Sequence, residues 1–115
     1  MKIVQLSGLA VGVDGGFVRV RTRKLGDIIM EVVDAGVRVE AAAISLSLVA
    51  HVEDRGVVLT DAEFGGKGEA LFISGANRAS VGIVDAHSNC ELRIGLQPTA
   101  SGMEVSVDEL CEDSS

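Results

Sequence analysis

Residues 40–56, EAAAISLSLVAHVEDRG, decide how the rest of the chain is read. Ile44, Leu48 and Val52 recur at a spacing of four residues, which is typical of one face of an α-helix. Gly56 stands where a residue in the left-handed conformation commonly ends a helix. The segment therefore predicts one long α-helix.

The predicted helix is apolar on more than one side. Ala43, Leu46, Ser47 and Ala50 lie on other sides of the helix than the stripe that starts at Ile44. A helix of this kind is either buried completely or presents its second side to another chain. Small residues would let a second helix approach closely, so these four residues are candidates for a homodimer interface. Complete burial within one domain is the alternative.

The composition indicates a globular protein with an aliphatic core. The 115 residues are 47% hydrophobic but only 3% aromatic, and a chain of this length fits one domain. The net charge of −7 argues against general binding to nucleic acid or to an anionic membrane. Cys90 and Cys111 are too few for a disulfide framework, and the sequence shows neither a signal peptide nor a membrane-spanning run. We expect a cytoplasmic protein without membrane insertion.

Short apolar or alternating runs on both sides of the helix predict strands. These runs cover residues 3–13, 17–23, 28–33, 57–59, 69–74, 79–84 and 90–96. The connections are short and no second helix separates the strands, so an antiparallel sheet is favoured over a parallel one. The expected fold class is α+β, an antiparallel sheet of five or more strands with one long helix packed on a face.

The two ends of the chain are expected to differ from its centre. The sequence Asp-Gly-Gly at 14–16 predicts a tight turn, so residues 1–24 are interpreted as a β-hairpin extension. Pro98 is expected to stop regular strand pairing. Residues 97–115 are then expected to form an acidic tail. The whole chain, residues 1–115, is expected to be a single domain.

The motifs that could carry chemistry are incomplete. The Gly-Gly-Lys-Gly loop at 65–68 resembles a phosphate-binding loop, but Asp61 and Gly68 stand where that motif needs a Gly and a Ser or Thr. His51 and His87 are not spaced to share a metal ion. We therefore expect no catalytic residue, no cofactor and no metal site.

A basic row is the most concentrated charge feature of the sequence. It consists of Arg19, Arg21, Arg23 and Lys24, which alternate in part with the valines of a predicted strand. These four residues are candidates for contact with an acidic partner, and an ordinary solvated strand face is the alternative. No aromatic residue interleaves the row, so base stacking on nucleic acid is not supported.

Residues 25–96 resemble the Roadblock/LC7 family of small dimerising domains. The resemblance is carried by DIIMEVVDAGVRVEAAAISLSLVAHVEDRG, EALFISGANRASVGIVDAHSNC and ELRIGL. In that family a strand leads through a polar loop into a long helix, and three antiparallel strands follow. The resemblance implies Roadblock/LC7-like, profilin-like layering. A weaker resemblance, over residues 27–66, is to the β-rich N-terminal domain of Cas1 integrases, from which no catalytic residue carries over.

The Roadblock/LC7 resemblance also implies a function. It predicts a non-catalytic scaffold or regulatory module that forms a homodimer and regulates a small GTPase. The alternative is a small ligand-binding or enzymatic α+β domain that uses the loop from Gly65 to Gly68.

Overall fold

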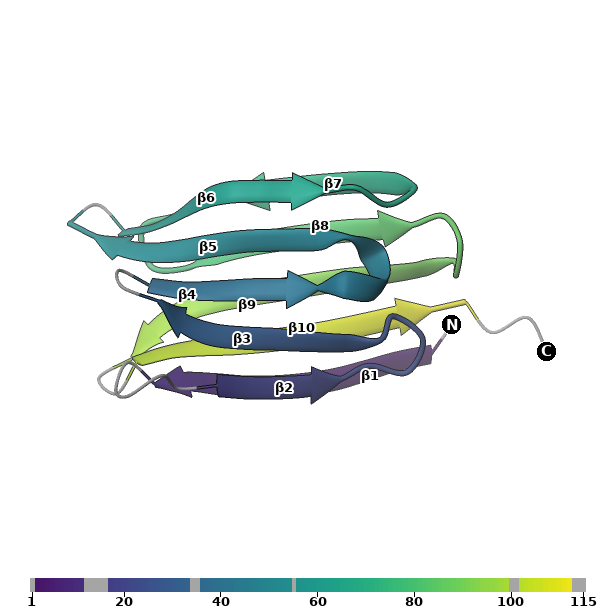
Figure 1. The fold of residues 1–115 in the computed structure, drawn as a ribbon, viewed down its shortest axis with the longest axis horizontal. Coiled ribbons are helices and arrows are strands. Elements are labelled where there is room, and N and C mark those ends of the chain that lie inside the picture. Colours follow the sequence, from purple (N-terminus) through teal and green to yellow (C-terminus); the bar gives the residue numbers. More distant parts are fainter. Residues whose placement is uncertain (1, 12–16, 34–35, 55, 100–101, 113–115) are drawn as a thin grey trace.

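The computed structural model of the chain is a sandwich of two antiparallel β-sheets. It describes residues 17–33, 36–54, 56–99 and 102–112, and the backbone of residues 2–11. Within these ranges the strands form two five-stranded sheets, in the orders β2-β3-β4-β5-β6 and β1-β10-β9-β8-β7 (Figure 1).

The strands of the first sheet lie together in the sequence, and those of the second come from both ends. The first sheet contains β2 (Phe17–Arg21), β3 (Asp27–Val33), β4 (Gly36–Ala41), β5 (Leu46–Glu53) and β6 (Gly56–Phe64). The second contains β1 (Lys2–Val11), β7 (Gly68–Ile73), β8 (Ala79–Asp85), β9 (Cys90–Thr99) and β10 (Gly102–Cys111). One turn of 3-10 helix, η1 (Ala42–Ile44), lies between β4 and β5.

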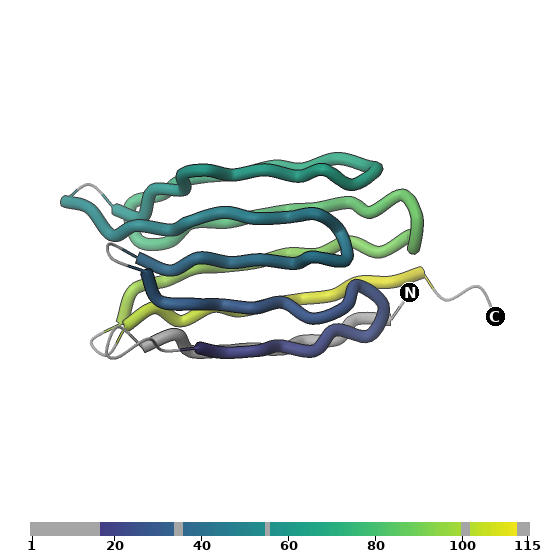
Figure 2. Tube along the Cα trace, viewed as in Figure 1, coloured from purple at the N-terminus to yellow at the C-terminus, as the bar shows by residue number. Residues whose placement is uncertain are grey.

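Strands that are neighbours in the sequence are mostly neighbours in a sheet. From β2 to β6, and again from β7 to β10, each strand pairs with the next one along the chain. β1 completes the second sheet by pairing with β10, from Lys2 opposite Cys111 to Val11 opposite Gly102. The two sheets lie over each other (Figure 2), and the molecule measures 45 by 22 by 21 Å.

Aliphatic side chains fill the space between the sheets. Alternate residues of a strand point to the same face, and most inward-facing residues of the central strands β3, β4, β5, β8, β9 and β10 are buried. The largest fully buried side chains are Leu25, Ile28, Met30, Leu46, Leu48, Ile83, Leu92, Ile94 and Leu96. Phe64 and Phe72 are only partly buried and pack against this core, so the fully buried interior matches the aliphatic composition of the chain.

The predicted long helix over residues 40–56 is wrong, and with it the α+β fold class. The segment forms the end of β4, the η1 turn, β5 and the first residue of β6. Ser45, at φ 52° and ψ 42°, reverses the chain between η1 and β5. In the part of the chain that the structure describes, no helix is long and apolar enough to cross a membrane.

The spacing that suggested a helix also fits a strand. Positions four residues apart lie on one face of either element. Leu46, Leu48 and Ala50 are buried in the core, whereas Ser47 and His51 are only partly buried on the opposite face. This period of two residues is the strand pattern. The alternation of serine with leucine at the start of β5 therefore correctly indicates a strand.

Both ends of the chain also differ from expectation. β1 pairs with β10 and β2 pairs with β3, so the strands of the expected hairpin over residues 1–24 lie in different sheets. The predicted turn at 14–16 lies outside the described residues. Much of the expected acidic tail, residues 97–115, forms β10 and the end of β9.

Pro98 does not stop strand pairing. It stands opposite Met103 of β10 within β9, while the pairing of β9 with β8 ends at Leu96. Pro98 therefore borders only one neighbouring strand, which is a position where a sheet tolerates proline.

Candidate functional site

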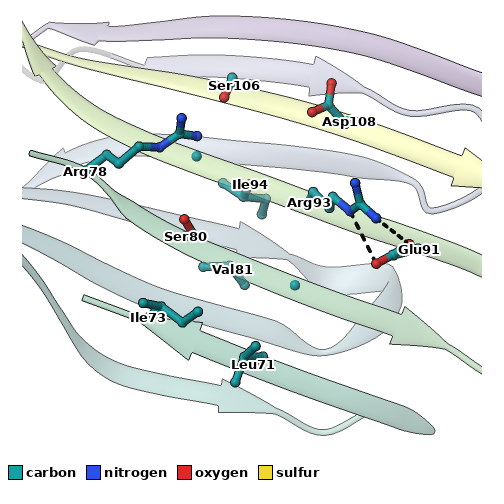
Figure 3. A pocket seen from close by; sticks show the side chains of 12 residues that line it. Leu71, Ile73, Arg78, Ser80, Val81, Glu91, Arg93, Ile94, Ser106 and Asp108 are labelled. Atoms are coloured by element: carbon teal, nitrogen blue, oxygen red, sulfur yellow. Dashed lines mark hydrogen bonds and ion pairs between the residues drawn. The ribbon is translucent and has the colours of Figure 1, made fainter. Parts of the chain in front are cut away.

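The outer face of the sheet that contains β7, β8 and β9 carries a ridge of exposed apolar side chains. Leu71 is 61% exposed and Ile73 is 49% exposed, and both project from β7, the last strand of this sheet (Figure 3). Val84 of β8 is 47% exposed on the same face. We name Leu71 and Ile73 the β7 ridge.

A trough runs along β8 beside this ridge. It is lined by Ser80 and Gly82 of β8 and by Arg93 of β9, and its volume is about 330 Å³. Ser80 and Arg93 are labelled in Figure 3. A second hollow of about 550 Å³ shares Gly82 with it and extends towards Glu69 and Val84. We name the hollow over Ser80 and Gly82 the β8 trough.

Gly82 lies in the middle of β8, where the fold itself does not require a glycine. A Cβ atom at this position would meet no heavy atom within 4 Å. Its φ is not among the positive values found in the described residues. Glycine weakens a strand, and within a strand it often marks the close approach of a ligand or of another backbone. The trough is therefore suited to receive a group from outside the molecule.

At position 95, in the neighbouring strand β9, the fold itself requires a glycine. The guanidinium of Arg78 lies over it, and a Cβ atom there would collide with that group and approach Ser106 Oγ to 2.8 Å. Arg78 thus covers the sheet at one end of the trough and places a positive charge there (Figure 3).

Charges of both signs line the far side of the trough. Arg93 contacts Glu91 through two nitrogen–oxygen pairs, each at 3.3 Å. Asp108 stands opposite Arg93 in the register of β9 and β10. Its Oδ1 atom is buried and has no hydrogen-bond partner among the described residues. This mixture of charges selects neither a strongly acidic nor a strongly basic ligand.

β7 is less protected against association than β2 and β6, the two edge strands of the other sheet. β6 carries Asp61 and Glu63, and its pairing with β5 shifts register where Asp61 adopts φ 51°. β2 carries Arg19 and Arg21. Charges and irregular backbone protect sheet edges from unwanted pairing. β7 has a single charged residue, Glu69.

The four residues predicted to form a dimer interface do not share a surface. Leu46 is 2% exposed and Ala50 is 0% exposed, and both belong to the core between the sheets. Ser47 lies on the opposite face of β5, and Ala43 is exposed in η1. Their proximity depended on the predicted helix, so the structure does not bring them together as one interface.

The predicted basic row is open to solvent along its length. Arg19 and Arg21 lie in β2, while Arg23 and Lys24 lie in the turn between β2 and β3. The Nε atom of Arg19 is 3.7 Å from Oδ2 of Asp27, in an exposed pair of small energetic weight. The structure thus keeps the four charges near one another, partly on a strand and partly on a turn.

A buried carboxylate from the other sheet holds this turn. Glu109 of β10 is 0% exposed. Its Oε1 atom accepts the backbone N–H of Arg23 at 2.6 Å, and its Oε2 atom accepts those of Lys24 at 2.9 Å and Leu25 at 3.2 Å. These hydrogen bonds compensate for the burial of a charge. Glu109 therefore joins the two sheets at this end of the sandwich.

Cys90 and Cys111 lie beside Glu109 and form a disulfide. They stand opposite each other in the register of β9 and β10. The sequence interpretation expected no disulfide framework, and it missed this pair because it placed Cys111 in a tail rather than in a strand next to Cys90.

The glycine-rich loop joins β6 to β7, and its backbone serves the fold. The N–H of Gly65 donates to the carbonyl oxygen of Ser45 at 2.8 Å. The carbonyl oxygen of Lys67 accepts the N–H of Ala86 at 2.9 Å. A Cβ atom on Gly66 would come within 2.9 Å of the Phe64 ring. The close contact at Gly66 and the φ of 134° at Gly68 account for these two glycines without a bound ligand.

The two histidines lie in different parts of the molecule. His51 is on β5, with its Nε2 atom 2.8 Å from Oγ1 of Thr60, and His87 is exposed in the turn between β8 and β9. Among the described residues, the group of three potential metal ligands is Cys90, Glu109 and Cys111, and it includes neither histidine.

Sequence reasoning did not identify the β7 ridge and the β8 trough. The strand at 69–74 was predicted, but its pattern does not show which face is left uncovered. The signal that could have drawn attention to this face is Gly82 in the middle of a predicted strand. Comparison of the chain with protein-family models, with curated protein sequences and with solved structures finds no match.

Proposed function

We propose that the protein is a non-catalytic interaction module that associates with a second copy of itself through the β7 ridge and the β8 trough. Gly82 is the observation that carries the proposal, because the space above it is open and the fold does not require a glycine there. A side chain from another molecule would fill this space, and Leu71 is the most exposed large apolar side chain among the described residues.

The ridge and the trough suit a two-fold dimer, in which one surface must complement itself. β7 and β8 are neighbouring strands, about 4.8 Å apart. Consider a two-fold axis that lies above the outer face of the sheet, parallel to these strands and midway between them. Rotation about this axis places β7 of each copy over β8 of the other. Leu71 stands opposite Gly82 in the register of β7 and β8. Leu71 of each copy would therefore lie over Gly82 of the partner subunit.

The same axis also brings the neighbouring residues of β7 over residues of β8 in the other copy. It places Ile73 over the small Ser80 and Glu69 over Val84, again because these residues are paired in the β7–β8 register. Glu69 lies near the start of β7, where its carboxylate can stay in water at the rim. The contact would thus remove the four ridge side chains of the dimer, Leu71 and Ile73 of each copy, from water.

The dimer is expected to be weak. The overlap covers two strands of each copy over about six residues, which is about 10 by 20 Å of sheet. This is at the small end of specific interfaces. Burial of each ridge side chain contributes about 1 kcal/mol, against the entropic cost of association. We expect a dissociation constant of about 10 µM or weaker.

Sedimentation velocity from about 10 µM to about 1 mM protein tests the proposal in the relevant range. The weight-average sedimentation coefficient of the wild type should rise with concentration, and that of Leu71→Lys should stay at the monomer value. Val52→Lys is the matched control, because Val52 is 55% exposed and lies on the other sheet. A wild type that is monomeric throughout, or a Val52→Lys variant that dissociates equally, overturns the proposal.

Regulation of a small GTPase is not part of this proposal. In the Roadblock/LC7 family the relevant platform is built from paired long helices, and the described residues form no such helix.

We retain a cytoplasmic location as a proposal. Cytosolic glutathione and thioredoxin would then keep Cys90 and Cys111 as thiols.

A further inference from the structure

Three metal-ligating side chains meet at one buried end of the sandwich. Cys90 and Cys111 are each 1% exposed and Glu109 is 0% exposed. Their ligand atoms all lie within 4.8 Å of one another. Cys90 faces Cys111 across β9 and β10, and Glu109 precedes Cys111 by two residues. Strand alternation therefore sets all three on the inner face of the sheet.

Glu109 can act as a ligand without releasing the turn that it holds. Its Oε1 atom accepts a single N–H from the described residues, that of Arg23. A carboxylate oxygen has two lone pairs, so Oε1 keeps one lone pair for a cation. The Oε2 atom meanwhile accepts the N–H groups of Lys24 and Leu25.

We propose that Cys90, Cys111 and Glu109 form a site for a thiophilic divalent cation, such as Zn²⁺, when the disulfide is reduced. A dithiol reductant gives two electrons and two protons to the disulfide. The sulfur–sulfur bond breaks, two thiols form, and the reductant becomes a disulfide. Binding of the cation then displaces the two thiol protons.

The charge balance favours this exchange. Two thiols and one carboxylate carry a net charge of −1, and two thiolates, one carboxylate and a divalent cation also carry −1. No additional net charge is therefore buried, which would otherwise be costly. Thiolate ligands select zinc-like ions, whereas Mg²⁺ and Ca²⁺ require oxygen ligands.

Three acidic residues lie close to Cys90. A hollow of about 300 Å³ borders Cys90 and is lined by three carboxylate residues, Asp85, Glu91 and Glu112. Such a concentration of negative charge raises the local concentration of cations. Three protein ligands leave a fourth position for water, as in many zinc sites.

Cadmium serves as the probe, because cadmium thiolates absorb in the ultraviolet through ligand-to-metal charge transfer. The full chain is reduced with a dithiol, freed of reductant without oxygen, and titrated with Cd²⁺. The absorption should rise up to one equivalent of Cd²⁺, and Zn²⁺ should abolish it by competition. The oxidised chain should show no such band. Absence of the band in the reduced chain overturns the proposal.

Variants separate this site from adventitious binding by surface carboxylates. Cys111→Ser should remove about half of the absorption, and Glu109→Gln should keep the band but weaken binding at least about tenfold. Glu104→Gln is the matched control, since Glu104 is an exposed residue of the same strand. Unchanged affinity in a folded Glu109→Gln variant refutes the role of Glu109. If that variant is unfolded by circular dichroism, an unchanged band in Cys111→Ser refutes the site.

Discussion

Replacement of Glu109 by glutamine should destabilise the oxidised protein markedly. The substitution keeps the shape of the side chain but removes the charge and one of the two acceptor oxygens. In the wild type these oxygens hold three backbone N–H groups of the β2–β3 turn, at 2.6, 2.9 and 3.2 Å. In the variant, the amide nitrogen would face at least one of these donors.

The expected loss follows from the partners of each donor. A hydrogen bond to a charged group contributes about 1.5–3 kcal/mol. The N–H of Leu25 also donates to Oγ1 of Thr22 at 2.9 Å, so it keeps a partner. Arg23 and Lys24 are exposed residues, so water can reach their N–H groups in part. We therefore expect a loss of about 2–4 kcal/mol in the free energy of unfolding.

Urea unfolding followed by circular dichroism measures this loss on oxidised protein. The slope of the transition should stay the same while its midpoint falls, because the surface exposed on unfolding is unchanged. Glu104→Gln, on the exposed face of β10, should stay within about 0.5 kcal/mol of the wild type. A Glu109→Gln variant that is equally close to the wild type would show that the carboxylate does not hold the two sheets together.

Two further predictions concern the core and the disulfide. Leu48 is 1% exposed, so Leu48→Ala should cost about 2–5 kcal/mol in urea unfolding. Val52→Ala, at a position that is 55% exposed near the end of the same strand, should cost less than about 0.5 kcal/mol. Equal losses in the two variants would contradict the burial of Leu48 in the core. Reduction of the disulfide, which joins residues 21 positions apart, should lower the free energy of unfolding by about 3 kcal/mol. An unchanged midpoint of urea unfolding in the presence of a dithiol reductant would contradict this prediction.

Several strands could be predicted from the sequence because their alternation is regular. The predicted runs 17–23, 69–74 and 79–84 correspond to β2, β7 and β8 within two residues at each end. Single strands were easier to predict than their pairing. β1 and β2 are separated by a strong turn signal, yet β1 pairs with β10 across the full length of the chain.

The helix prediction failed for a physical reason. Ile44, Leu48 and Val52 are four residues apart, and this spacing does not separate a helix from a strand. The decisive positions were Ser45 and Ser47, which interrupt the apolar surface with a period of two. Ser45 turns the chain and Ser47 lies opposite the core face of β5. Alanine at 41–43 favoured a helix locally, but only the η1 turn formed.

The candidate site depended on tertiary structure that the sequence could not show. Leu71 and Ile73 are ordinary residues of an alternating strand, and they are exposed because they lie on the face of the sheet that no other described part of the chain covers. Glu109 could not be recognised as buried while its segment was interpreted as a tail. Gly82 was the one local irregularity within a strand that pointed to the trough.

Gly82→Val provides the most direct test of the proposed self-association. The fold accommodates the new side chain, because a Cβ atom there meets nothing within 4 Å, and valine favours a strand more than glycine does. The side chain fills the trough, so sedimentation velocity up to about 1 mM should show a folded monomer while the wild type associates. A Gly82→Val variant that associates as the wild type does would contradict the account and would place the contact on another surface.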